Sequence, residues 1–415
     1  MLGLRMPTGS DVQVQGTNDD AQVSKLSCAK GGYFKDEYIQ YFVRRASKRS
    51  PLINRGYYSR YAALRQLLLN FLSCTKAAGL PSQVLVLGAG FDTTWFQLAA
   101  EGQQPDRYLE VDFKEVTARK VGIIKQQPTL LNLVQTVNSQ AAAAAAGDAG
   151  AGAQQGAGSG GQGDAAATAG SAEAQGGSSG QAAGSGGMPP PPVPARAGGD
   201  GAGSAAQAGG GVHIEPTAGE LVSNCYTVLP VDLRDPVAFA AAVQRAGFDT
   251  SLPTYILSEC VLVYMEPEHS SAVVRWLAGH FKQAAAIAIY EQVKPGDAFG
   301  RQMVANLESR GCPLRGLPAT PTLDAHCRRL VDNGWGSAKS YDMDHLYKHA
   351  LDPADRARVE KLEVFDEFEE WHMIQEHYSI SVGTNSAGGG RCPPGLLSSL
   401  GFNAPGASLD AAARN

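Results

Sequence analysis

The residues best placed to do chemistry in this 415-residue chain are two glycines and three acids at predicted strand ends. Gly88 and Gly90 follow a short apolar run, and such a turn brings the main chain close to a ligand because glycine carries no Cβ. The acids that close three later strand-like segments are Asp112, Asp232 and Glu259. Parallel strands share their carboxyl edge, so we expect these five residues to line one binding site.

Each acid has a ligand-binding interpretation and a structural alternative. Asp112, about twenty residues after the glycines, can accept hydrogen bonds from both hydroxyls of a ribose, or can cap the next helix. Asp232 can accept from an adenine amino group beside the Leu233 main chain, or can be an N-cap or turn residue. Glu259 can bind a cofactor ammonium or ribose, or can pair with an arginine.

The glycine turn also indicates which cofactor the site takes. Dinucleotide-binding turns follow Gly-x-Gly-x-x-Gly, and here the third position is Thr93. A turn that need not hold a pyrophosphate suits S-adenosylmethionine, with its adenine, ribose, sulfonium and amino-acid end. The substitution therefore disfavours a nicotinamide-dependent oxidoreductase.

Strands and helices alternate along the sequence, which predicts a doubly wound, Rossmann-like α/β fold with a mainly parallel sheet. Extra helices before the first strand and late in the chain are expected to form a cap. The expected strands are 84–87, 107–112, 226–230, 254–257, 284–290 and 377–382. The expected helices are 36–43, 57–72, 95–100, 114–125, 236–246, 268–281, 299–310, 322–333 and 354–363.

Composition divides the chain into foldable and unfoldable parts. Residues 139–211 are almost entirely Ala, Gly, Ser and Gln, which predicts a disordered insert. We also expect a flexible N-terminus over 1–13 and a flexible tail over 384–415. The folded domain would then consist of 14–138 and 212–383.

Charge and cysteine usage narrow the class of protein. The net charge of −5 argues against sequence-independent nucleic-acid binding. No apolar run is long enough to span a membrane, and we expect no membrane association. Seven widely spaced cysteines without a C-x-x-C pair indicate reduced thiols in a cytoplasmic protein, with no zinc site and no other metal.

Several blocks together resemble the leucine carboxyl methyltransferase family, and their order holds from about residue 16 to 382 outside the insert. The blocks are 54–60, 87–94, 110–113, 232–235, 258–265, 290–292 and 365–371. The resemblance implies an S-adenosylmethionine-dependent methyltransferase fold. It also implies methyl esterification of the C-terminal leucine of the protein phosphatase 2A catalytic subunit. By matching position, the implied cofactor contacts are Lys25, Arg60, Gly88, Gly90, Asp112, Asp232, Leu233 and Glu259.

A leucine α-carboxylate is ionised at neutral pH and needs neither a strong base nor a metal to attack a sulfonium methyl. Arg60 is the first candidate to hold the carboxylates and Lys25 the second. Tyr264 is expected to be a pocket wall or hydroxyl donor, or else a core residue. We expect a monomer.

Two other functions stay open. One is an O-methyltransferase acting on a tRNA or small-molecule carboxylate, and the other is a non-catalytic partner of the phosphatase. The chain ends soon after the predicted catalytic part, which favours the protein-modifying branch.

Overall fold

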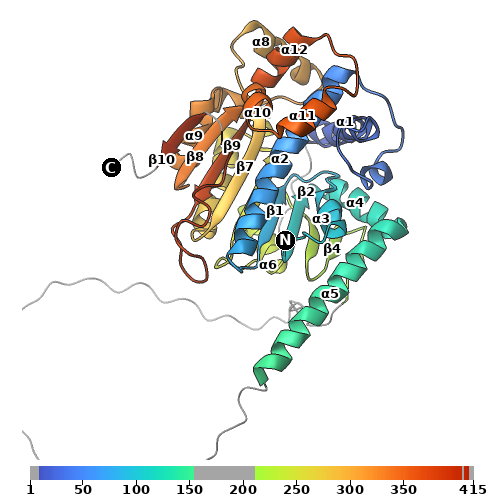
Figure 1. The fold of residues 1–415 in the computed structure, drawn as a ribbon, viewed down its shortest axis with the longest axis vertical. Helices are drawn as coiled ribbons and strands as arrows, with labels where there is room; N and C mark the ends of the chain where they lie inside the picture. Colours follow the sequence, from blue (N-terminus) through green and yellow to red (C-terminus); the bar gives the residue numbers. More distant parts are fainter. Residues whose placement is uncertain (1–8, 154–210, 404–405, 411–415) are drawn as a thin grey trace, which may run out of the picture. The chain divides into compact units, whose positions relative to one another are not determined.

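The computed structural model describes residues 9–153, 211–403 and 406–410, and its centre is a mixed ten-stranded sheet (Figure 1). The strand order is β10-β8-β9-β7-β6-β1-β2-β5-β4-β3. Five neighbouring strands are parallel: β1 (Gln83–Leu87), β2 (Arg107–Asp112), β5 (Tyr226–Pro230), β6 (Thr254–Glu259) and β7 (Ala285–Gln292). The flanking strands pair antiparallel: β3 (His213–Glu215), β4 (Glu220–Val222), β8 (Ser337–Asp342), β9 (Tyr378–Asn385) and β10 (Ala407–Asp410).

Helices cover both faces of the sheet, because alternate residues of its buried strands point to opposite sides. In β1, Val84 and Val86 belong to one apolar cluster, whereas Leu85 and Leu87 belong to the other. The first cluster contains residues of α1 (Gly9–Lys30), α2 (Pro51–Ala77), α3 (Thr94–Ala100), α4 (Lys114–Gln126), α5 (Pro128–Ala153), α10 (Met343–His349), α11 (Pro353–Val359) and α12 (Phe368–Glu376). The second contains residues of α6 (Pro236–Arg245), α7 (Pro267–His280) and α9 (Leu323–Asp332).

The remaining elements are short or lie beside the site. They are α8 (Ala298–Ser309) and three 3-10 helices: η1 (Ile39–Phe42), η2 (Leu262–Tyr264) and η3 (Leu317–Ala319). The sequence predicts a helix over 36–43, but the structure forms only the short 3-10 helix η1 in this range. The side chain of Asp36 accepts from the main-chain N–H groups of Tyr38 and Ile39, which favours a turn over a continuous helix.

The structure corrects the expected limits of the irregular segments. Helix α1 begins at Gly9, inside the segment expected to be flexible, and Asp11 pairs with Arg234. Helix α5 continues to Ala153, beyond the expected start of the insert, because alanine favours helix. Residues 154–210, most of the expected disordered insert, lie outside the described residues, as do 1–8.

The tail expected to be flexible from residue 384 is built into the fold over most of its length. Strand β10 pairs with β8, and Leu397, Leu400 and Phe402 are buried. These apolar side chains gain from burial, whereas the surrounding glycines and prolines had suggested an unfolded segment. The expectation of a mainly parallel sheet is also only half right, since five strands pair antiparallel at its edges.

Candidate functional site

A cavity of about 1130 Å³ lies at the carboxyl edge of the parallel strands. The sequence-predicted site residues, which come from α1, α2 and the segments after four different strands, all line it. They are Lys25, Arg60, Gly88, Gly90, Asp112, Asp232, Leu233, Glu259 and Tyr264. The topology therefore brings these residues together as the sequence predicts.

The turn after β1 requires glycine at both predicted positions. Gly88 has a φ of +56°, and a Cβ there would lie 2.6 Å from the side chain of Val261. Gly90 has a φ of +53°, and its Cβ would lie 2.5 Å from Oδ1 of Asn18 on α1. Larger residues are disfavoured by both the left-handed backbone and these contacts. The turn therefore packs closely against Val261 and α1, and its residues 88–90 line the cavity.

Asp112 is held by the main chain at the end of β2. Its carboxylate accepts from the N–H of Gly90 at 2.6 Å and from the N–H of Phe113 at 2.7 Å. Burial raises the pKa of Asp112 to about 6, although these two N–H groups act in the opposite direction. The N-cap of α4 is Phe113, so the helix-cap alternative for Asp112 is wrong.

Asp232 follows β5 and pairs with Arg234 two residues later. The Arg234 Nε donates to Asp232 at 2.8 Å, and its terminal nitrogens reach Asp11 at the start of α1 at 3.1 and 3.2 Å. The N-cap of α6 is Asp235 rather than Asp232. Asp232 also accepts from the Arg234 main-chain N–H, as a turn residue does. An adenine contact would therefore be made beside an existing ion pair.

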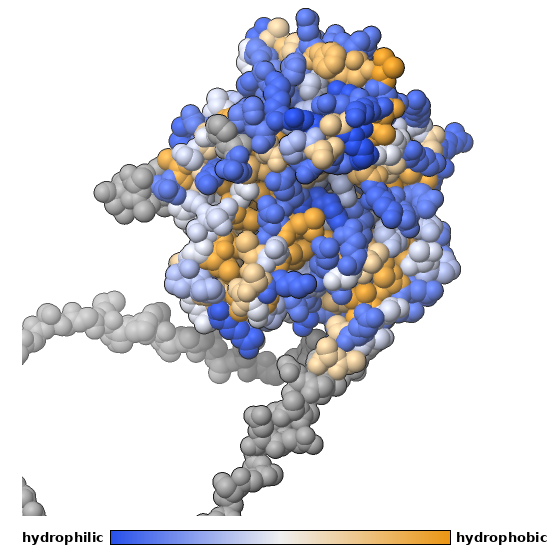
Figure 2. All heavy atoms as spheres, in the orientation of Figure 1, coloured by the Kyte–Doolittle hydropathy of each residue, from blue (hydrophilic) through white to orange (hydrophobic). Residues whose placement is uncertain are grey.

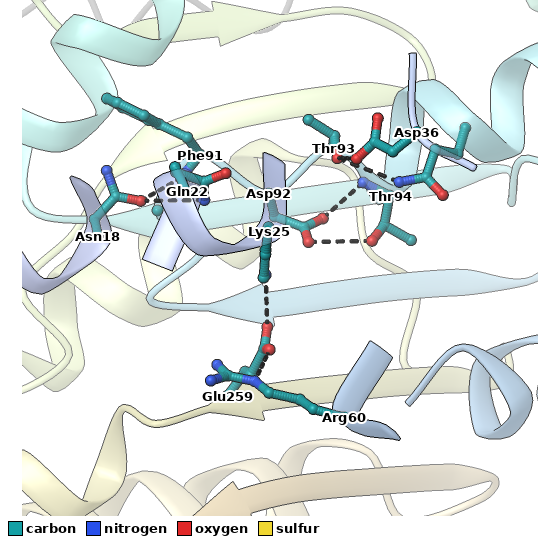
Figure 3. Close-up of polar contacts among 12 residues, drawn as sticks. Asn18, Gln22, Lys25, Asp36, Arg60, Phe91, Asp92, Thr93, Thr94 and Glu259 are labelled. Atoms are coloured by element: carbon teal, nitrogen blue, oxygen red, sulfur yellow. Dashed lines mark hydrogen bonds and ion pairs between the residues drawn. The ribbon is translucent and has the colours of Figure 1, made fainter. Parts of the chain in front are cut away.

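Glu259, at the end of β6, receives two cations (Figure 3). Arg60 of α2 donates through Nε to one carboxylate oxygen, and Lys25 of α1 lies 3.4 Å from the other. Burial alone would raise the pKa of Glu259, but the two cations outweigh it and lower the pKa to about 2. The arginine pairing considered from the sequence is thus present, and it occurs inside the cavity.

Arg60 is mostly buried, unlike the surface residue that its helix alone would suggest. Burial lowers its pKa, but Glu259 more than compensates and raises it well above the usual value. The guanidinium carbon lies 4.5 Å from the ring centre of Tyr290, which is within the range of a cation–π contact. Since Glu259 accepts from Nε, the guanidinium has four further N–H donors for a ligand.

Part of the cavity wall is apolar and aromatic. This part includes Leu52, Ile53, Tyr264, Ile374 and Tyr378. Tyr378 stacks on Tyr290 with ring centres 5.4 Å apart, so the aromatic wall reaches the ring beside Arg60. Tyr264 lines the cavity and also packs on the cluster of Val263, Leu314 and Leu317. Tyr264 is therefore both a wall of the cavity and a residue packed against an apolar cluster.

Sequence reasoning missed the polar side chains of α1 that face the turn. The side-chain oxygen of Asn18 accepts from the Phe91 N–H at 2.9 Å, and Gln22 donates weakly to it at 3.5 Å (Figure 3). Helix α1 has a polar sequence without a continuous apolar stripe, so no periodicity identified it as a helix. Sequence reasoning also missed Arg234 as the ion-pair partner of Asp232. The short spacing between these two residues was the one sequence feature that could have indicated the pair.

Two further classes of site are absent from the part of the chain that the structure describes. No group of three or more His, Cys, Asp or Glu side chains there could hold a metal ion. Among the same residues, no helix combines the length and apolarity needed to cross a membrane.

Comparison with known proteins places these features in a family. A sequence profile described as leucine carboxyl methyltransferase matches residues 14–145 and 210–278. The Arabidopsis thaliana leucine carboxyl methyltransferase 1 homolog is 38% identical over 95% of this chain and 93% of its own length. Bos taurus leucine carboxyl methyltransferase 1 is 31% identical over 91% and 92%. Rattus norvegicus tRNA wybutosine-synthesizing protein 4 is 32% identical over 88% of this chain but 43% of its own length.

Proposed function

The chain belongs to the leucine carboxyl methyltransferase family, and from this premise we propose that it methylates the α-carboxylate of a C-terminal leucine, with S-adenosylmethionine as methyl donor. The proposed substrate is the catalytic subunit of protein phosphatase 2A. The observation that carries the proposal is the cluster of Arg60, Glu259 and Lys25 inside the cavity. Two cations converge on one carboxylate there, and their remaining N–H donors suit an anionic ligand.

The cavity residues fit the parts of S-adenosylmethionine. Asp112 offers a carboxylate for the ribose hydroxyls, and Asp232 with the Leu233 main chain offers acceptors and a donor for adenine. Lys25 and Arg60 suit the carboxylate of the amino-acid end, while Glu259 suits its ammonium. The glycine turn lets the ligand approach the main chain. We therefore propose these residues as the cofactor contacts.

When bound, S-adenosylmethionine would supply an electrophilic methyl group: an O–C bond to the carboxylate would form as the C–S bond breaks, giving the methyl ester and S-adenosylhomocysteine. Arg60 holds the substrate carboxylate through its remaining N–H donors, and Tyr290 contacts the guanidinium. The apolar wall around Tyr264 and Tyr378 excludes water from the nucleophile. Catalysis then comes from alignment and desolvation, without a general base among these residues.

We also propose that the protein acts as a monomer in the cytoplasm. All seven cysteines are free thiols, and Cys28, Cys225, Cys312, Cys327 and Cys392 are buried. This usage is typical of a reducing compartment, where disulfides are rare.

A second candidate function has one observation in its favour. The rat relative at 32% identity is named for tRNA wybutosine synthesis, so a carboxyl group on tRNA is an alternative acceptor. The two acceptors need the same cation cluster and the same methyl donor, and they differ in what approaches the mouth of the cavity.

The deciding experiment is methyl transfer from labelled S-adenosylmethionine to purified phosphatase 2A catalytic subunit. We expect base-labile label on the intact subunit and none on a subunit that lacks its terminal leucine, because the ester forms on that residue. Total tRNA is offered in a parallel reaction. Label on tRNA alone would contradict the proposal and support the second candidate.

A further inference from the structure

The surface beside the cavity carries a concentration of exposed apolar side chains. Among the described residues, seven large apolar side chains are strongly exposed, and four of them lie within 362–373. These four are Leu362, Val364, Phe368 and Met373. Val364 is 92% exposed and Phe368 is 53% exposed. Exposed apolar surface gathered in one place and bordered by polar residues is typical of a protein interaction site.

This surface continues to the mouth of the cavity. The segment 363–375 lies along the first turns of α2: Asn54 donates to Glu363 at 3.0 Å, and Ser59 donates to Gln375 at 2.6 Å. Ile53, one residue before Asn54, is 37% exposed and lines the cavity, as Ile374 does. We call the exposed apolar residues here the apolar lip, which consists of Ile53, Leu362, Val364, Phe368 and Met373.

The segment that carries most of the apolar lip is rich in acidic residues. Between positions 360 and 376 the sequence has seven carboxylates and one lysine, Lys361. Asp366, Glu369 and Glu370 are exposed or partly exposed, whereas Glu363 is already paired with Lys48 at 3.0 Å. Figure 2 shows apolar residues in orange among hydrophilic ones at the top of the view, where Figure 1 places α12. A complementary partner surface would be apolar with basic residues around it.

We propose that the apolar lip docks the folded body of the protein substrate, through an apolar and basic surface next to that protein's C-terminal tail. This inference rests on the proposed function. The terminal carboxylate of the substrate has to reach Arg60 inside the cavity. Its C-terminal tail therefore passes through the mouth of the cavity, and its folded body lies against the surface around the mouth. Burial of the apolar lip against a partner would remove exposed apolar area from water and so favour docking.

The test is steady-state methylation of intact phosphatase 2A catalytic subunit by the full-length chain. We expect the double variant V364S/F368S to raise KM for the protein substrate about tenfold, because two exposed anchors are lost. The kcat and the Kd for S-adenosylmethionine should stay within about twofold, since neither residue lines the cavity. The charge-reversal variant E369K/E370K should also raise KM and should weaken its dependence on salt.

The matched control is V237S on α6, since Val237 is 65% exposed but does not line the cavity. We expect its KM to equal that of the wild type. An unchanged KM in V364S/F368S would overturn the docking role while leaving the proposed function intact. A change only in self-association of that variant, seen by sedimentation, would overturn it as well. No transfer by the wild type would overturn the proposed function and the docking role together.

Discussion

At the scale of single residues, the cation cluster is the feature on which the proposed chemistry depends most. Glu259 brings Arg60 and Lys25 together although they come from different helices. The sequence predicts all three residues as neighbours of a cofactor, because Glu259 ends a strand and the other two match the family pattern. It does not reveal the stacking of Arg60 on Tyr290, since that contact depends on how α2 crosses the sheet edge.

Replacing Arg60 tests the cluster directly. Arg60→Ala should lower kcat/KM by the equivalent of ~2–5 kcal/mol, because a buried charge pair loses one partner. Arg60→Lys should recover only part of this loss, since an ammonium cannot present a planar fork of donors. Steady-state kinetics with labelled cofactor measure both effects.

Arg65→Ala is the matched control for this prediction. Arg65 lies on the same helix but pairs with the half-exposed Glu101 outside the cavity. Its loss should leave kcat/KM nearly unchanged. Equal losses in the Arg60 and Arg65 variants would show that the cluster has no special role.

The raised pKa of the Asp112 carboxyl leads to a prediction about how cofactor binding depends on pH. Burial raises the pKa of its carboxyl to about 6, above the ordinary 3.8, so the folded protein takes up this proton more readily than the unfolded chain. The stability from this protonation is full below about pH 3.8 and is lost as the pH rises through 6. If Asp112 accepts from the ribose hydroxyls as proposed, cofactor binding has the opposite dependence, because the hydroxyls then need the ionised carboxylate as acceptor.

We therefore expect S-adenosylmethionine affinity to fall as the pH drops below 6, by up to about tenfold per pH unit. Calorimetric titration between about pH 5 and 7.5 measures it. Asp112→Asn should bind more weakly at neutral pH and show a flat profile across this range. A variant profile as steep as that of the wild type would assign the dependence to another group.

At the scale of elements, α1 is the helix that is hardest to predict from the sequence. Its residues are mostly polar and form no apolar stripe. The helix is stabilised by contacts with residues far away in the sequence, such as Asp11 with Arg234 and Asn18 with the Phe91 N–H. The parallel strands were readable because each is a short apolar run that ends in a glycine or an acid. Strand β8 has the sequence Ser-Ala-Lys-Ser-Tyr-Asp, and only its pairing with β9 and β10 makes it a strand.

The contact between α1 and the glycine turn predicts a non-additive pair of mutations. Gly90→Ala should destabilise folding by at least ~2 kcal/mol, from left-handed strain and from the contact with Asn18 Oδ1. In an Asn18→Ala background the same change should cost about 1 kcal/mol less, because only the strain remains. Urea denaturation of the four proteins of this cycle measures the coupling.

Gly102 provides the control for that cycle. It has a φ of +65° but no atom within 4 Å of an added Cβ, so Gly102→Ala carries strain without a clash. Its cost should be the same in the wild type and in the Asn18→Ala background. Additive costs for Gly90→Ala and Asn18→Ala would show that α1 does not press on the turn.

At the scale of the whole molecule, one cavity collects residues from positions 11 to 378 of the chain. Among the residues that the structure describes, none between 117 and 230 lines the cavity. Composition leads us to expect an insert over 139–211, and most of that range lies outside the described residues. It failed for the tail, because buried positions such as Leu397 and Leu400 are too few to stand out among glycines and prolines.

Removing residues 154–210 and joining the ends with a short Gly/Ser linker should leave cofactor affinity within a few-fold of the wild type. The reason is that every cavity-lining residue remains in place. Calorimetric titration of the shortened protein with S-adenosylmethionine gives the result. A loss of binding beyond tenfold would assign the segment a part in building the site.

The ion-pair cluster around Glu259 has a consequence for product release in the proposed reaction. The substrate would enter as an anion beside Arg60 and Lys25, and the ester that forms is neutral. The methyl transfer itself would therefore remove the attraction that held the acid. We expect the product ester to bind more weakly than the acid, because it has lost the charge that the guanidinium attracts.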